Sequence, residues 1–355
     1  MRSIIFDRFR DPDLVRKICD EIKKNASNIN LMEVCGTHTM AIGRYGLRQI
    51  LPDEINLISG PGCPVCVTPT SVIDSLLDLK EVTIATFGDL LRVPGSKGTL
   101  EMARGRGVDV QVVYSPLDAL KLAEKREVVF AGIGFETTSP AVGSTIIEAA
   151  RREVKGFSVL SAFKLIPPAL DALLASEDTR IEGFILPGHV STIIGSRPYD
   201  FIATRYGIGG IIAGFEPVDI LEAVNELLIQ KREKRSEIKI GYRRCVCSEG
   251  NVRAKEILNQ VFEPTDSLWR GLGWIKNSGL RIREDFEPFD ATKKYDIHPP
   301  EIEDDPRCQC GGVLKGIIRP NQCPLFARIC NPKNPIGPCM VSSEGSCAAY
   351  YYYER

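Results

Sequence analysis

Cysteine is the residue type whose number and spacing in this sequence could support chemistry. The chain of 355 residues contains twelve cysteines, which in a reducing compartment indicate metal or redox chemistry rather than a framework of disulfides. Three of them, Cys35, Cys63 and Cys66, lie in turns rich in glycine and proline. Six lie after residue 300: Cys308, Cys310, Cys323, Cys330, Cys339 and Cys347.

The six C-terminal cysteines have the spacing C-x-C-x12-C-x6-C-x8-C-x7-C. No histidine follows His298, which excludes a mixed cysteine–histidine zinc site within this tail and leaves a four-cysteine zinc site open. A [4Fe–4S] cluster takes four thiolates, although the spacing matches no ferredoxin pattern. Two thiols would then remain, enough for one disulfide that could exchange electrons with the cluster.

The N-terminal cysteines lie in two turns, Cys35-Gly36-Thr37-His38 and GPGCPVC at 60–66. The motif Cys63-x-x-Cys66 alone is ambiguous, because it fits a redox dithiol, a structural disulfide or half of a zinc site. With Cys35 and His38 it supplies three thiolates and an imidazole. This soft set of donors suits iron, zinc or copper(I).

Three further polar residues, Glu136, His189 and Glu216, lie in or next to glycine-containing turns. Each could be a hydrogen-bond partner of a metal-binding group, and either glutamate could instead be a base or a solvated capping residue. No turn matches a P-loop, and no GxGxxG motif opens a helix. Nucleotide binding is therefore only weakly indicated.

Short apolar runs alternate with helical patterns between about residues 28 and 230, which predicts α/β units with parallel sheets. The expected strands are Asn30–Val34, Ile55–Ser59, Val82–Thr86, Asp109–Val113, Glu127–Ala131, Phe157–Ser161, Gly183–Leu186 and Gly210–Ala213. The cysteine, histidine and glutamate turns all follow expected strands. In open parallel sheets, ligands collect at these strand ends.

We expect two similar α/β lobes that face a cleft, plus a loop-rich, cysteine-rich [4Fe–4S] domain. Residues 25–124 and 125–235 each hold four expected strands and would form the lobes. Residues 236–355 would form the iron–sulfur domain, because a loop-rich segment needs a staple. Residues 1–24 predict an N-terminal helix, and the charged run at 231–239 predicts a linker or a solvated helix end.

Composition limits the classes of partner. The formal net charge is −1, so no basic field would attract nucleic acid or an anionic membrane. No apolar run approaches the roughly 18 residues that a bilayer span needs. Charges interrupt the N-terminal sequence MRSIIFDRFRDPD, which argues against a secretory signal and for a cytoplasmic location.

Six motifs together resemble the hydrogenase maturation factor HypD family. They are CGTH (35–38), GPGCPVC (60–66), GFETTSP (134–140), LPGHVS (186–191), GFEPVD (214–219) and the tail CPLF…GPCMVSSEGSCAAYY (323–351). The motifs occur in the family's order and span nearly the whole chain. The resemblance implies two α/β lobes, a cluster domain and a role in assembling the Fe(CN)2CO group of [NiFe] hydrogenases.

The resemblance also implies partners: a small HypC-type chaperone that shares the iron, a HypE-type protein that supplies cyanide and, indirectly, the hydrogenase large subunit. It implies that Cys35, Cys63 and Cys66 hold iron carrying cyanide and carbon monoxide in the cleft, with His38 completing the first motif. By similarity to ferredoxin–thioredoxin reductase, the implied ligands of a [4Fe–4S] cluster are Cys308, Cys323, Cys330 and Cys347. Cys310 and Cys339 are then implied as the redox pair.

Three cysteines fall outside these motifs. Cys19 lies in an amphipathic helical pattern and is expected in the core, and Cys245 with Cys247 forms a C-x-C that is expected to be an incidental buried pair. The leading interpretation is a redox-active assembly scaffold rather than a conventional turnover enzyme. A cluster-dependent protein thiol–disulfide reductase and a zinc-stapled binding protein stay open. The source of the carbonyl ligand, the hydrogenase served and the oligomeric state are undetermined.

Overall fold

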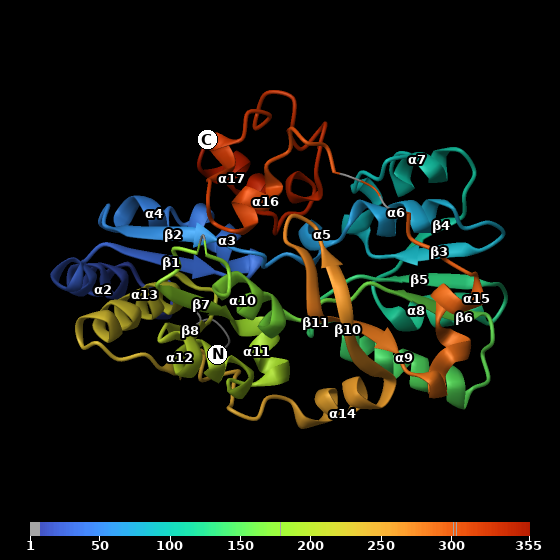
Figure 1. The fold of residues 1–355 in the computed structure, drawn as a ribbon, viewed down its shortest axis with the longest axis horizontal. Helices are drawn as coiled ribbons and strands as arrows, with labels where there is room; N and C mark the ends of the chain where they lie inside the picture. Colours follow the sequence, from blue (N-terminus) through green and yellow to red (C-terminus); the bar gives the residue numbers. More distant parts are fainter. Residues whose placement is uncertain (1–7, 178, 301, 303) are drawn as a thin grey trace.

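The computed structural model describes residues 8–355 except 178, 301 and 303. Two parallel sheets form two α/β lobes, and a cysteine-rich segment lies over one side of them (Figure 1). The two-lobe α/β architecture expected from the sequence is thereby confirmed. No helix in the described ranges is long and apolar enough to cross a membrane.

The first sheet has the strand order β2-β1-β7-β8-β9, with all neighbours parallel. Its strands are β1 (Ile29–Glu33), β2 (Ile55–Ser59), β7 (Gly183–Pro187), β8 (Gly209–Ala213) and β9 (Ile238–Ile240). Its helices are α2 (Pro12–Asn25), α3 (Gly36–Arg44), α4 (Leu47–Ile50), α10 (Ile166–Leu174), α11 (Gly188–Ile194), α12 (Asp200–Tyr206) and α13 (Pro217–Arg232), with the 3-10 turn η2 (Arg197–Tyr199).

The second sheet has the order β4-β3-β5-β6 and is also parallel. Its strands are β3 (Thr83–Thr86), β4 (Val110–Val112), β5 (Val128–Gly132) and β6 (Phe157–Ser161). Around it lie α6 (Thr70–Leu77), η1 (Gly88–Arg92), α7 (Leu100–Gly105), α8 (Pro116–Ala123), α9 (Ser139–Arg151), α14 (Val252–Val261), η3 (Glu284–Phe289) and α15 (Ala291–Lys294).

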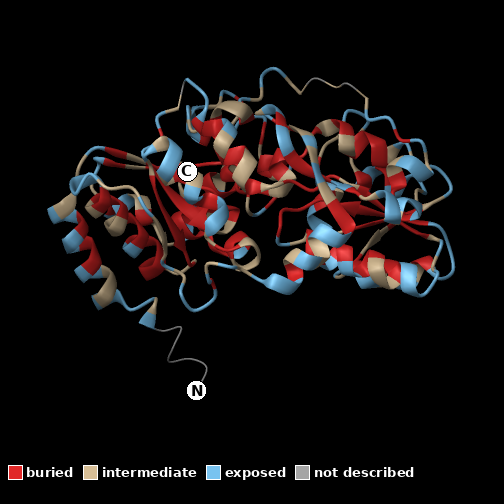
Figure 2. Cartoon of the chain, turned by 60° about the horizontal axis from the view of Figure 1, so that its bottom comes forward, coloured by how far each residue is buried: buried red, intermediate tan, exposed pale blue. Residues whose placement is uncertain are grey.

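Both sheets are covered on both faces, which explains why most positions of their strands are apolar. Along β1, Leu31 belongs to the core on one face of the sheet and Met32 to the core on the other. Along β5, Phe130 and Val129 divide in the same way. Figure 2 shows the resulting buried strands at the centre of each lobe.

The division of the chain at residues 124 and 125 is wrong as a description of the sheets. Strands β1 and β2 pair in one sheet with β7, β8 and β9, while β3 to β6 form the other. The chain therefore leaves the first sheet after β2, builds the second, and returns. Apolar patterning identifies strands but does not specify their neighbours, because each buried strand has a similar pattern.

The expected iron–sulfur domain at 236–355 is also divided differently. Strand β9 extends the first sheet, so the charged run at 231–239 contains a helix end and the start of an edge strand. An antiparallel hairpin, β10 (Phe262–Trp269) with β11 (Gly273–Ile282), lies between the lobes (Figure 1). The cysteine-rich part holds the short elements α16 (Cys310–Leu314), η4 (Pro320–Gln322), η5 (Pro338–Met340) and α17 (Ser346–Tyr353).

The expected N-terminal helix corresponds to α2, and residues 1–7 of that expectation lie outside the described residues. Cys19 is buried in α2, as expected. Cys245 and Cys247 are both exposed, so the expectation of a buried pair is wrong. Both lie in the loop between β9 and α14, where no strand or helix turns their side chains toward a core.

Candidate functional site

The first two cysteine turns meet at their backbones. Cys35 follows β1 and precedes α3, and the Gly36 N–H donates to the Gly62 carbonyl at 3.0 Å. A Cβ on Gly62 would clash with the backbone at Cys35. Glycine at this position therefore allows the closest approach of the two strand ends. The sequence-based expectation that these turns share one edge of the sheet is met by β1 and β2 being neighbours.

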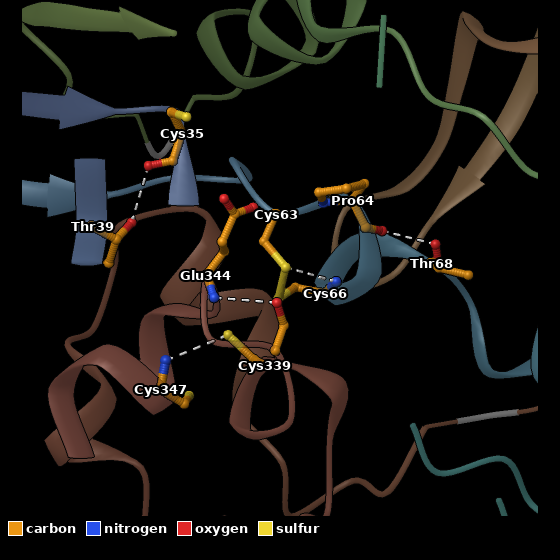
Figure 3. Close-up of a disulfide and its surroundings, with 10 residues drawn as sticks. Cys35, Thr39, Cys63, Pro64, Cys66, Thr68, Cys339, Glu344 and Cys347 are labelled. Atoms are coloured by element: carbon orange, nitrogen blue, oxygen red, sulfur yellow. Dashed lines mark hydrogen bonds between the residues drawn. A yellow bond between two sulfur atoms is a disulfide. The ribbon is translucent and has the colours of Figure 1, made fainter. Parts of the chain in front are cut away.

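Cys63 and Cys66 form a disulfide across the short helix α5 (Pro64–Val67), with their Cα atoms 5.3 Å apart. Both residues are buried. In Figure 3 the disulfide lies between Cys35 and the tail residues Cys339 and Cys347. A disulfide was one of the alternatives for this motif, and neither sulfur is a thiolate until the bond is reduced.

Cys35 is a buried thiol in an acidic environment. Burial, reinforced by the negative charges of Glu344 and Glu33, raises the pKa of Cys35 to about 12. Glu33 accepts hydrogen bonds from the Cys35 N–H at 3.2 Å and from Thr39 Oγ1. Burial raises the pKa of Glu33 to about 7. Cys35 is therefore a neutral thiol at pH 7, and a metal ion would have to displace its proton.

His38 is fully buried at the start of α3. Its Nε2 lies 2.8 Å from the Gly214 carbonyl and must donate to it, while its Nδ1 has no hydrogen-bond partner among the described residues. Burial lowers the pKa of His38 to about 4, so the ring is neutral at pH 7. The Nδ1 lone pair is consequently available to a ligand.

An aromatic stack joins the two histidine turns. Phe215 lies between the rings, with its centroid 4.8 Å from His38 and 4.0 Å from His189. Burial lowers the pKa of His189, and the charge of Glu344 opposes this shift. The structure thus brings His189 into the same site as His38 through the ring of Phe215. Among the described residues, no hydrogen bond joins the two histidines.

Glu344 is a site residue that sequence reasoning did not single out. It comes from the cysteine tail, and its Oε1 accepts a hydrogen bond from Thr37 Oγ1 at 2.7 Å. A Cβ on Gly36 would clash with Glu344. The tail therefore presses directly on the turn that carries Cys35. The available signal was an acidic residue between Cys339 and Cys347 in an otherwise small and apolar segment.

The two turn glutamates have different environments. Glu216 precedes α13 and pairs with Arg10, with Nη2 2.7 Å from Oε1, so it occupies the capping position that was one of its alternatives. Glu136 is buried between the lobes. Its Oε1 accepts from the Ile166 N–H at 2.9 Å, whereas its Oε2 has no hydrogen-bond partner in the part of the chain that the structure describes. Burial raises the pKa of Glu136 to about 7.

The raised pKa of Glu136 predicts a pH-dependent stability. The pKa of about 7 in the folded protein exceeds the ordinary 4.5. The stability that protonation of Glu136 contributes is therefore fully present below pH 4.5 and is lost as the pH rises through 7. Glu136→Gln mimics the protonated acid. We expect its free energy of unfolding to exceed that of the wild type by up to about 3 kcal/mol at pH 8 and by little at pH 5.

Denaturant titrations of both proteins at the two pH values measure this difference. Glu101→Gln, at an exposed position on α7, is the matched control and should show no such change. A constant difference between wild type and Glu136→Gln across the pH range would contradict the prediction.

Cys310, Cys339 and Cys347 form a chain of neighbouring sulfurs. The thiols of Cys310 and Cys347 both hydrogen-bond to the Cys339 sulfur and lower the pKa of Cys339. The Cys347 N–H also approaches this sulfur, at 3.5 Å. Cys310 and Cys339 are thus adjacent free thiols, placed as a redox pair requires but not joined.

The remaining tail cysteines surround a small apolar cluster. Leu325, Cys330 and Met340 form its centre, and Cys308, Cys323 and Cys347 pack against it. All four of Cys308, Cys323, Cys330 and Cys347 belong to this cluster or pack against it. The four expected cluster ligands are therefore gathered in one place.

No three histidine, cysteine, aspartate or glutamate side chains in the described ranges are arranged to hold a single metal ion. The spacing of the four tail cysteines is compatible with a [4Fe–4S] site, since each thiolate of such a cluster binds a different iron atom. The four sulfurs then surround the whole cluster rather than a single ion. The donor set, four cysteines without a histidine, fits this group.

The disulfide and the free tail thiols share one buried core. Cys63, Cys66, Cys310 and Cys339 all belong to the same apolar cluster, and α5 packs beside η5, which carries Cys339. Residues far apart in the sequence are thus connected without intervening solvent.

The family model HypD, described as "Hydrogenase formation hypA family", matches residues 13–354. The chain belongs to the HypD family. It is 43% identical to hydrogenase maturation factor HypD2 of Bradyrhizobium diazoefficiens, covering 98% of this chain and 96% of that protein. It is 44% identical to the HypD proteins of Cupriavidus necator and Escherichia coli, covering 98% of this chain and 97% and 98% of theirs.

Membership of the HypD family gives this chain its general role in hydrogenase maturation. The match extends from α2 through the cysteine tail, so it includes both lobes and every cysteine turn described above.

Proposed function

We propose that this HypD-family chain is a redox-active scaffold on which the Fe(CN)2CO group of [NiFe] hydrogenases is assembled. The observation that supports this proposal is the continuous buried core that contains Cys63, Cys66, Cys310 and Cys339, beside the turn of Cys35. Iron with diatomic ligands, the cargo, requires soft donors and shelter from water, and this core offers both.

Cys35 and the reduced pair Cys63 and Cys66 would hold the cargo iron. Each thiol loses a proton on binding, which favours binding at higher pH. Among the described residues, His38 Nδ1 has no hydrogen-bond partner. This nitrogen would either accept a hydrogen bond from a group at the iron or bind the iron itself. A small HypC-type chaperone would complete the iron's ligands, because a site left open to a partner can release its metal to the hydrogenase large subunit.

Cys308, Cys323, Cys330 and Cys347 would hold a resident [4Fe–4S] cluster, which supplies single electrons when bound. The Cys339 sulfur is the natural thiolate of the redox pair, since the Cys310 thiol and the backbone N–H of Cys347 lower its pKa. A HypE-type protein would supply cyanide. So many free thiols are suited to the cytoplasm.

A protein thiol–disulfide reductase is the alternative, and the Cys63–Cys66 disulfide beside the tail thiols favours it. Iron content separates the two functions. We expect chain purified anaerobically with its HypC-type chaperone to be brown, to hold more than four iron atoms per chain, and to show infrared bands of bound cyanide and carbon monoxide. Four irons without such bands would favour the reductase, and colourless zinc-containing protein would contradict both.

Cys310 and Cys339 are predicted to form a disulfide under mild oxidation, because their sulfurs are already in hydrogen-bond contact. Mass mapping of anaerobically reduced and then oxidised protein should find this pair linked. Cys310→Ser and Cys339→Ser should retain cluster iron near the wild-type level while hydrogenase maturation falls at least tenfold. Cys245→Ser, at an exposed thiol, is the control. Failure to detect the linked pair under any oxidising condition would count against the relay.

A further inference from the structure

Arg270 is a buried cation at the tip of the β10–β11 hairpin. Its side chain is 3% exposed, and its Nε lies 3.2 Å from Asp304 Oδ2 without the alignment of a hydrogen bond. Asp304 is 35% exposed and also accepts from Thr70 Oγ1 at 2.8 Å. Removing a guanidinium from water costs several kcal/mol unless opposite charge compensates it. Among the described residues, the only carboxylate paired with Arg270 is the partly exposed Asp304, which compensates the charge only in part.

Sulfur atoms of the tail lie on another side of the guanidinium. A Cβ placed on Gly337 would be 3.4 Å from both Arg270 Nη2 and Cys308 Sγ, so the cation and this sulfur flank the same glycine. Negative charge at the Cys308 sulfur would therefore lie close to the guanidinium of Arg270.

The backbone fixes the position of this charge. The Arg270 N–H donates, at 2.8 Å, to the carbonyl of Val67, the residue that follows Cys66. Gly271 has a φ of +75°, and a Cβ there would lie 2.6 Å from the Gly311 Cα. The hairpin tip is thus held between the helix of the Cys63–Cys66 disulfide and the helix that begins at Cys310.

We propose that Arg270 is a positioning residue that sets the reduction potential of the tail cluster by holding one positive charge beside Cys308. The inference rests on the proposed function, since it requires that cluster. Uptake of one electron from a low-potential one-electron donor makes the cluster and its four thiolates one unit more negative, with no other bond made or broken. A fixed positive charge stabilises this reduced state relative to the oxidised one.

Four variants test the sign of the effect. Arg270→Gln removes the positive charge and should shift the reduction equilibrium about tenfold toward the oxidised cluster. For one electron, this shift corresponds to a reduction potential that is lower by about 59 mV. Asp304→Asn removes the opposing negative charge and should shift the potential upward. Arg270→Lys keeps the charge and should restore most of the wild-type value. Arg281→Gln, on the same hairpin but 65% exposed, should leave it unchanged.

Anaerobic redox titration, followed by visible absorption and electron paramagnetic resonance, measures these potentials, and iron analysis reports cluster content. Unchanged potentials, or shifts of the same sign in Arg270→Gln and Asp304→Asn, would overturn the role of Arg270 alone. Should Arg270→Gln lose its cluster, an upward shift in Asp304→Asn supports the role and a downward or absent shift refutes it. A wild-type protein without a cluster would overturn the proposed function and this role with it.

Discussion

Replacement of Cys35 by alanine is expected to abolish the infrared bands of iron-bound cyanide and carbon monoxide and to leave the tail cluster intact. Cys35 is buried beside Glu344 and Glu33, and its pKa is raised to about 12. Only a bound metal ion would hold it as a thiolate at neutral pH. Alanine removes this donor without removing any ligand expected for the tail cluster.

The same loss is expected for Cys63→Ala and Cys66→Ala, because each variant lacks one of the two sulfurs that the reduced pair would offer to the iron. The measurement is infrared spectroscopy of each variant purified with the HypC-type chaperone, with iron analysis in parallel. Proteins are silent in the window of these stretching bands. Omission of the chaperone should weaken iron retention in the wild type.

Cys245→Ala is the matched control, since Cys245 is exposed and far along the chain from the cysteine turns. Its bands should equal those of the wild type. Unchanged bands in the variants of Cys35, Cys63 and Cys66 would show that the diatomic-bearing iron lies elsewhere. The proposal that iron binds at the Cys35 turn would then have to be abandoned.

Single replacement of Cys308, Cys323, Cys330 or Cys347 by alanine should remove the visible absorption of the [4Fe–4S] cluster and about four iron atoms per chain. The four residues surround one small apolar cluster. Since metal binding contributes directly to folding, we also expect the tail to lose protection against proteolysis and amide hydrogen exchange.

Cys247→Ala, at an exposed cysteine, should retain the cluster and the protected tail. The core on the outer face of the first sheet and both cores of the second sheet should stay folded in all of these variants, because none of the four cysteines belongs to them. Full retention of cluster iron in Cys323→Ala would contradict the assignment of ligands.

Much of the fold follows from local patterns. All eight expected strands correspond to strands of the structure, and Ile55–Ser59 and Phe157–Ser161 have the same bounds. The hairpin at Phe262–Ile282 was missed, because proline, glycine and charged residues interrupt its alternation. The hairpin packs through contacts between its two strands and with the cores of the lobes, which no local period encodes.

The sequence by itself determined the chemistry available to this protein. Twelve cysteines, the absence of histidine after His298, and six ordered motifs indicated soft-metal and thiol chemistry and the HypD family. These are properties of residue type and spacing, which are local. They also predicted two α/β lobes, because apolar runs and helical periods repeat along the chain.

Only the tertiary structure decided which residues meet. It brought Glu344 against Gly36 and Thr37, placed Arg270 beside Cys308, and divided the strands between sheets in an order that the chain does not follow. Such contacts join segments that lie from tens to hundreds of residues apart in the sequence. Their formation depends on the simultaneous packing of both lobes, the hairpin and the tail, because each buried polar group needs a partner that another segment supplies.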